Sequence, residues 1–165
     1  MKNHIDRRLA TSVGIALCVA LMMSVPVVAD DVDAVRAVKM DPEKLAGIDL
    51  PAEEPFMDAE DVLEGSHRPR GEILYYGDQL IVEVYEDDPA TLRFDEPYIY
   101  DEFVTVLSGK VIVTADDGVS QEFVAGDTFV VPKGFTGTWQ MLGNFRELIV
   151  IERQAYEEAY GTTAD

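Results

Sequence analysis

The feature that most constrains the fold is a dense series of short apolar runs between residues 71 and 152. Each run is rich in Val, Ile, Tyr or Phe, and turn-forming Gly, Asp, Asn or Pro residues separate it from the next. The runs lie at 72–76, 80–85, 91–94, 102–107, 110–114, 121–124, 128–131, 138–142 and 147–151. Short strands at this spacing, with no amphipathic helix between them, predict an all-β domain built as a sandwich or a barrel.

Alternation along the run at 102–107 indicates a strand with two apolar faces. Even-numbered residues point to one side of the strand and odd-numbered residues to the other, and both sets are largely apolar. A strand buried on both sides separates a barrel interior from a second sheet or a second subunit. We therefore expect the protein to form a homodimer.

The first residues have the order of a secretory signal. Positive residues precede an uncharged run at 9–25, and small residues then lead to Ala29. We predict a signal peptide at 1–29, cleaved near Ala29, and hence a periplasmic or secreted protein. The alternative is an uncleaved membrane anchor, although the run is marginal against the roughly 20 residues that a membrane-spanning helix needs.

Charge and composition exclude several classes of partner and site. The chain has a formal net charge of -19 at pH 7, with 32 acidic and 13 basic residues. This charge argues against nucleic acid as a partner and confines membrane contact to export, since nucleic acids and anionic membranes attract positive charge. Cys18 and His4 belong to the predicted leader, so the mature chain keeps His67 as its one histidine. Neither a disulfide nor a zinc site built from Cys or several His is then possible.

Residues 30–70, between the leader and the first apolar run, are acidic and contain several prolines. We predict an extended arm with little helix. Asp41 and Pro42 fit the N-cap and first turn of one short helix, and 58–63 fits a second helical turn. His67 lies in this arm, outside the strand pattern, and is predicted to be a solvated linker histidine.

Two motifs carry a resemblance to a known family. The first is EFVTVLSG at 102–109, an acid followed by an apolar strand and a glycine corner. The second is GDTFVVPKG at 126–134, followed by GTW at 137–139. Together they resemble a cupin, and more narrowly the small single-domain cupins related to (S)-ureidoglycine aminohydrolase. The resemblance implies a jelly-roll β-barrel, which we place at 71–152, with a C-terminal tail at 153–165 that begins with a helical turn.

The metal ligands that the resemblance implies are mostly missing. Metal-dependent cupins supply two histidines and a glutamate from the first motif and another histidine from the second. Glu102 matches the glutamate, whereas Gly137 stands at the last histidine position. Ureidoglycine aminohydrolases carry Glu-x-His-x-x-x-His, and the matching positions are Glu96, Tyr98 and Glu102. We predict no cofactor, the alternative being a weakly bound Mn²⁺, Mg²⁺ or Ca²⁺ at Glu96 and Glu102.

The same region of the barrel predicts a small-molecule pocket. Carboxylates and aromatic rings are predicted to converge inside the barrel, and by strand alternation the indole of Trp139 faces the barrel interior. The rings either stack on an organic ligand or fill the interior. The predicted ligand-binding residues are Glu96, Tyr98, Tyr100, Glu102 and Trp139.

Three functions remain open from the sequence. The favoured one is an exported cupin with a degenerate metal site that binds a small polar organic ligand, or a partner, without catalysis. The alternative is a divalent-metal-dependent aminohydrolase-like enzyme acting on a ureido or amino acid-type substrate, with Glu102 as its base if burial raises the pKa of that carboxyl. The third is an interaction module in which the barrel is a dimer scaffold and the acidic arm binds.

Overall fold

The computed structural model describes residues 35–161, so the predicted signal peptide lies outside the described residues. From Ala37 onward these residues belong to one compact unit. Its elements are α1 (Pro42–Leu45), β1 (Val62–Gly65), β2 (Arg70–Tyr76), β3 (Leu80–Asp87), β4 (Ala90–Phe94), β5 (Glu102–Ala115), β6 (Ser120–Val124), β7 (Thr128–Val131), β8 (Gly137–Glu152) and α2 (Arg153–Tyr160). No helix within 35–161 is both long enough and apolar enough to cross a membrane.

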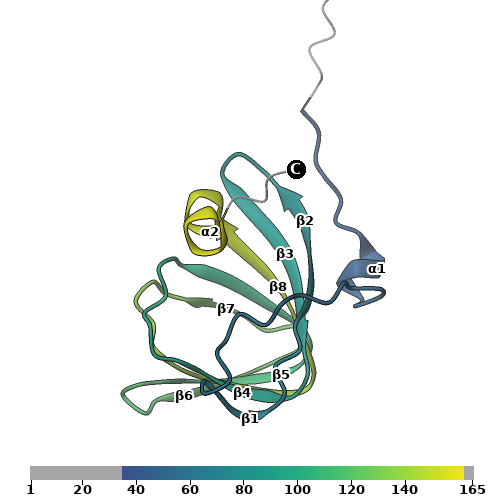
Figure 1. Cartoon of the computed structure of the whole chain (residues 1–165). Coiled ribbons are helices and arrows are strands. Elements are labelled where there is room, and N and C mark those ends of the chain that lie inside the picture. The colour runs from purple at the N-terminus through teal and green to yellow at the C-terminus, as the bar shows by residue number, and fades with distance from the viewer. Residues whose placement is uncertain (1–34, 162–165) are drawn as a thin grey trace, which may run out of the picture. The chain divides into compact units, whose positions relative to one another are not determined.

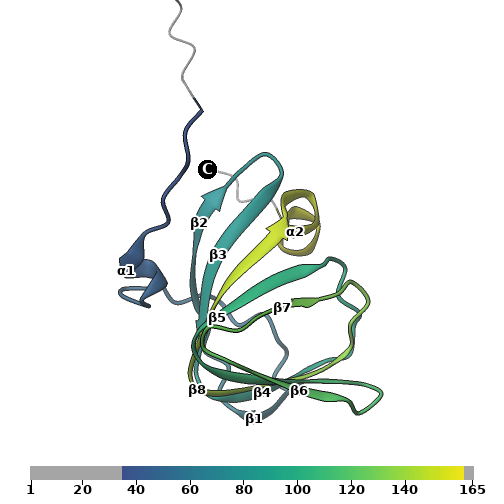
Figure 2. The same cartoon turned by 180° about the vertical axis from the view of Figure 1, so that it is seen from behind.

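The strands form one antiparallel sheet that curls into a barrel (Figures 1 and 2). Strands β1, β4, β8, β3 and β2 are neighbours in that order, and β5 pairs with β6, β7 and β8. The two longest strands, β5 and β8, pair along most of their length and connect the two halves of the barrel. The predicted all-β, jelly-roll architecture is confirmed.

Both long strands continue where the sequence predicts corners. The runs at 102–107 and 110–114 join into β5, and the last two runs join into β8. At Gly109 the register between them shifts and φ is 68°. A Cβ at Gly109 would lie 2.8 Å from the carbonyl oxygens of Leu142 and Asn144, so a residue without a side chain is needed. The glycine therefore bends the strand pair instead of ending it.

Alternation along β5 sets the barrel core. Val104 and Val106 are buried inside, together with Trp139, Met141 and Phe145 of β8. The predicted alternation over 102–107 is therefore confirmed, and the even-numbered residues are the ones that face inward. On the opposite face, among the described residues, Phe103 is exposed and Thr105 and Leu107 are half-buried.

The arm joins the sheet. The short helix predicted at Asp41 and Pro42 is present as α1, and the Asp41 carboxylate accepts a hydrogen bond from the Glu43 backbone N–H at 2.8 Å. The prediction of a second helical turn at 58–63 is wrong. A tight turn at 58–61 leads directly into β1, which pairs antiparallel with β4. The edge of β4 offers unpaired backbone groups, and an added strand satisfies them where a helical turn would not. The helical turn predicted after the barrel is present as α2.

His67 is buried, contrary to the prediction of a solvated linker residue. Its Nδ1 lies 2.6 Å from Asp87 Oδ2, and the Arg68 backbone N–H donates to Asp87 Oδ1 at 2.7 Å. The Tyr85 hydroxyl also donates to Asp87 Oδ2, at 2.9 Å. The Asp87 carboxylate is fully buried and requires such donors. The arm supplies two of them, and this draws His67 inside.

Candidate functional site

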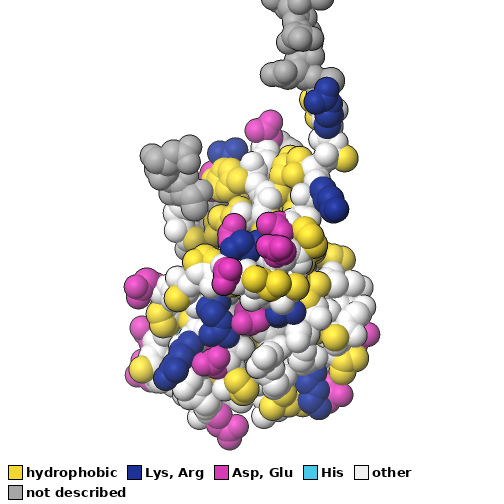
Figure 3. Space-filling view, turned by 90° about the vertical axis from the view of Figure 1, so that its right-hand side faces the viewer, with side chains coloured by type: hydrophobic (Ala, Val, Ile, Leu, Met, Phe, Trp, Pro, Cys, Tyr) yellow, Lys and Arg dark blue, Asp and Glu magenta, His cyan; other side chains and the backbone are white. Residues whose placement is uncertain are grey.

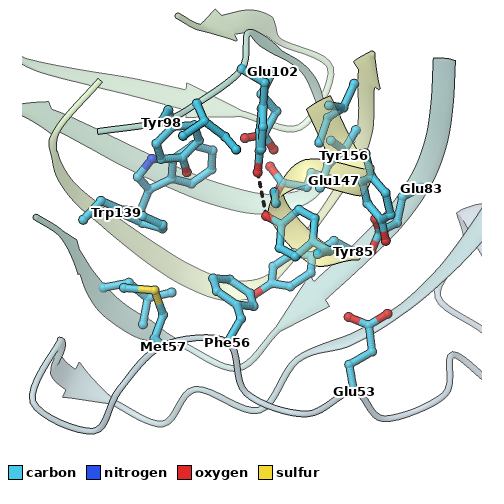
Figure 4. A pocket seen from close by; sticks show the side chains of 18 of the residues that line it. Glu53, Phe56, Met57, Glu83, Tyr85, Tyr98, Glu102, Trp139, Glu147 and Tyr156 are labelled. Carbon is cyan, nitrogen blue, oxygen red and sulfur yellow. Dashed lines mark hydrogen bonds between the residues drawn. The ribbon is translucent and has the colours of Figure 1, made fainter. Parts of the chain in front are cut away.

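A cavity of about 410 Å³ occupies the inside of the barrel, a size typical of small-molecule sites, which span ~300–1,000 Å³. Inward side chains of β3, β4, β5 and β8 form about half of its wall, and the loop at 97–100 lies along another part. The arm contributes Phe56 and Met57, and α2 contributes Tyr156 and Tyr160. Figure 4 shows Phe56 and Met57 facing Glu102 across the cavity. Segments from both ends of the described chain therefore complete a pocket that the barrel strands begin.

The loop before β5 separates the predicted site residues. Tyr98, Tyr100, Glu102 and Trp139 all line the cavity, whereas Glu96 is exposed and does not. The Tyr98 backbone N–H donates to the Phe135 carbonyl at 3.0 Å, and the Gly134 N–H donates to the Tyr98 carbonyl at 2.7 Å. These bonds fix Tyr98 inward and leave Glu96 at the surface. Four predicted residues therefore meet, and the predicted pair of Glu96 and Glu102 does not.

Three glutamates of the barrel wall share this cavity. Glu102 and Glu147 are buried, and Figure 4 shows both carboxyl groups pointing into the same end of the cavity, with Glu83 beyond them. Burial raises the pKa of Glu102 to about 8, and the charge of Glu83 adds to the shift. Burial raises the pKa of Glu147 well above its usual range, and the Glu102 charge adds to that. The pKa of Glu83 rises to about 7, again mainly through burial. An empty cavity at neutral pH therefore favours protonated carboxyl groups.

Two buried polar atoms of the cavity wall lack a hydrogen-bond partner within the described residues. They are Glu147 Oε2 and Trp139 Nε1, and their residues are 3% and 4% exposed. An unsatisfied buried polar group costs about 1–3 kcal/mol. Both atoms belong to residues that line the cavity, so an occupant with a donor and an acceptor would satisfy them.

The family comparison agrees with the barrel. The family described as the EutQ-like cupin domain matches residues 89–147, which include both motifs, the first on β5 and the second around β7, and most of β8. The chain therefore contains a region, residues 89–147, that matches a cupin domain. The narrower resemblance to the ureidoglycine aminohydrolase type stays a prediction.

Solved structures share the cupin fold at low identity. A protein of unknown function from Pseudomonas syringae pv. tomato is 21% identical with a TM-score of 0.56; the match covers 62% of this chain and 43% of that one. The EutQ protein of Clostridium difficile is 20% identical with a TM-score of 0.50, covering 73% and 97%. The polyketide cyclase RemF from Streptomyces resistomycificus is 18% identical with a TM-score of 0.52, covering 71% and 80%. This chain thus spans less than half of the Pseudomonas protein, and no curated protein matches it. These likenesses establish the fold alone.

The residues of this cupin do not fit the metal that the fold often holds. Residues 35–161 contain no group of three or more His, Cys, Asp or Glu side chains arranged to hold an ion. At Gly137, the position of the second-motif histidine, a Cβ would lie 2.1 Å from the Thr114 carbonyl oxygen. The backbone of β5 thus occupies the space that a histidine there would need. No reaction step is assigned to a metal.

The sequence contained a signal for two of the wall residues that the prediction missed. On β3, Glu83 points to the same side of the strand as Tyr85, and on β8, Glu147 points to the same side as Ile149. Both acids therefore lie on an inward face that is otherwise apolar. An inward acid is rare enough to mark a site. Phe56 carries no comparable signal, because its position depends on how the arm folds back.

Proposed function

We propose that this cupin-domain protein is exported and binds a small polar organic molecule in the barrel cavity, without a metal. The observation that supports this most directly is a pair of buried atoms without a hydrogen-bond partner among the described residues, Glu147 Oε2 and Trp139 Nε1, both of which belong to residues that line one cavity. Filling the barrel with side chains would leave neither space nor unsatisfied polar groups.

Aromatic side chains support an organic occupant over an inorganic ion. Tyr98 packs edge-on against Tyr100 and Phe135, with ring centroids 5.8 and 5.7 Å apart, and Trp139 lies 6.3 Å from Phe94. Flat rings fixed in this way offer large apolar surfaces at little cost in conformational entropy. An organic ligand can pack against these surfaces while its polar groups reach the carboxyl groups.

A second candidate function is metal-free acid–base catalysis. Glu102 and Glu147 are two buried carboxyl groups whose pKa values are raised mainly by burial; the charge of Glu83 adds to both shifts, and the charge of Glu102 adds to that of Glu147. Such a pair can hold one proton and release it near neutral pH. Catalysis would use the same cavity, with Glu102 as the acid or base.

The test uses the mature chain, residues 30–165, and its single tryptophan. Because Trp139 lines the cavity, its fluorescence reports occupancy without a label. A panel of neutral, cationic and anionic organic compounds is screened by melting temperature and by Trp139 fluorescence. Binding predicts that at least one class changes both signals in a saturable manner. If every class leaves both signals unchanged, the proposed function is wrong.

A further inference from the structure

Acidic and basic residues are distributed very differently between the cavity and the outer surface. Among residues 35–161, five glutamates line the cavity, whereas no Lys, Arg or His side chain does. The lining glutamates are Glu53, Glu54, Glu83, Glu102 and Glu147. None of them forms an ion pair with a basic residue of the described chain.

Basic residues of the described chain form ion pairs with acids outside the cavity instead. Arg146 pairs with Glu86 at 2.8 Å, and Arg70 pairs with the same carboxylate at 3.1 Å. Lys44 of α1 pairs with Glu72 at 2.8 Å. Figure 3 shows this face, on which Lys and Arg side chains lie among Asp and Glu side chains. The basic residues of these ion pairs therefore meet acids outside the cavity, whereas the cavity carboxyl groups have no positive partner among the described residues.

We infer that the ligand of the cavity carries a positively charged amine, seated at the Glu102 and Glu147 end; this deepens the proposed function and rests on it. Glu147 Oε2 is buried, points into the cavity and accepts from no described residue. A primary ammonium group has three N–H donors and can satisfy this oxygen and a Glu102 oxygen together. An anionic ligand would meet several carboxyl groups and no compensating cation.

The aromatic wall favours the same charge. A cation near the face of Tyr or Trp is attracted by the ring's negative π face, and this attraction grows when water is excluded. Tyr85, Tyr98 and Trp139 all border the cavity that contains the carboxyl groups. Trp139 Nε1 is a donor with no acceptor among the described residues, so an acceptor on the ligand would satisfy it. The ligand class is therefore an amine with an apolar or aromatic body and a hydrogen-bond acceptor.

Three probes of similar size separate this inference from the proposed function. Phenethylamine is the cation, 2-phenylethanol the neutral match and 3-phenylpropionate the anion, each titrated into the mature chain at pH 8 with Trp139 fluorescence as the signal. We expect the amine to bind at least about tenfold more tightly than the alcohol, as for a buried charge pair. The anion is expected not to bind.

Equal binding of amine and alcohol, or preference for the anion, would overturn the amine inference and leave the cavity function standing. If these probes and the wider panel all fail to bind, the proposed function itself is wrong.

Charge-removing variants locate the amine. Glu147→Gln and Glu102→Gln keep the side-chain shape and should each weaken phenethylamine about tenfold while leaving 2-phenylethanol unchanged. Glu64→Gln is the matched control, because Glu64 is exposed on β1 and outside the cavity wall. Circular dichroism establishes that each variant is folded. Unchanged amine affinity in both cavity variants would place the amine elsewhere and overturn the inference.

Discussion

His67 Nδ1 lies 2.6 Å from Asp87 Oδ2, and both side chains are almost fully buried. This contact joins the arm to the end of β3. The ring of Phe56 packs edge-on against His67 with centroids 4.6 Å apart, and Phe56 lines the cavity. The pair therefore fixes the arm segment that forms one wall of the pocket.

Replacing His67 by Ala should destabilise the fold by about 1–3 kcal/mol, because the buried Asp87 carboxylate loses one of its hydrogen-bonding partners. Urea denaturation followed by circular dichroism measures the loss. The neighbouring Ser66 is exposed, so Ser66→Ala is the matched control and should leave the free energy of unfolding unchanged. Equal stability of the His67 variant and the wild type would mean that the contact does not hold the arm.

The arm also shows where sequence reasoning stops. The barrel strands follow from local alternation and turn residues, so the positions of β2 to β8 and the inward facing of Glu102 and Trp139 could be predicted, although β5 and β8 were each predicted as two runs. The arm has no periodic pattern, and its position depends on β4 and Asp87 partners that are distant in the sequence. Glu96 was misplaced for a related reason. Matching the motif gave only the position of Glu96 in the sequence. The backbone hydrogen bonds of Tyr98 determine which side chains of the loop point inward.

The buried carboxyl groups predict that the free energy of unfolding falls as the pH rises. The pKa of Glu102 is about 8 in the folded protein against an ordinary value of 4.5. The stabilisation from its protonated form is fully present below about pH 4.5 and is lost as the pH rises through about 8. Glu102→Gln cannot release a proton, so its stability relative to the wild type should increase over this range, by up to about 1.4 kcal/mol per pH unit. Urea denaturation at pH 5, 7 and 9 measures the difference. A constant difference between the two proteins would show that the folded-state pKa of Glu102 is not raised.

The same titration predicts pH-dependent binding of a permanent cation. Phenethyltrimethylammonium keeps its charge at every pH, so any change in its affinity comes from the protein. Its affinity should rise from pH 6 to pH 9 as Glu83 and Glu102 ionise, since their pKa values are about 7 and 8. Each proton displaced on binding contributes up to about a tenfold gain per pH unit. Calorimetry in two buffers with different ionisation enthalpies counts the protons released. Affinity that is flat with pH and release of no protons would mean that the bound cation does not meet these carboxyl groups.

The outer face of β5 predicts how two chains pair. Phe103 is 44% exposed and lies opposite Val130 of β7, which is 54% exposed, and opposite Val150 of β8. Val150 in turn lies opposite Val82 of β3. This row gives an apolar stripe across four strands, the kind of surface that a self-complementary dimer interface covers. The protein should therefore be a homodimer, measured by light scattering coupled to size-exclusion chromatography.

Phe103→Glu should convert this dimer into a monomer, because the substitution places two symmetry-related charges in the apolar interface. Phe103 points away from the cavity, so phenethylamine binding should persist in the variant. Val119→Glu is the control, since Val119 is an exposed apolar residue in the turn before β6, away from the stripe. A wild-type protein that remains monomeric at high micromolar concentration, or a Phe103 variant that remains dimeric, would exclude this face as the interface.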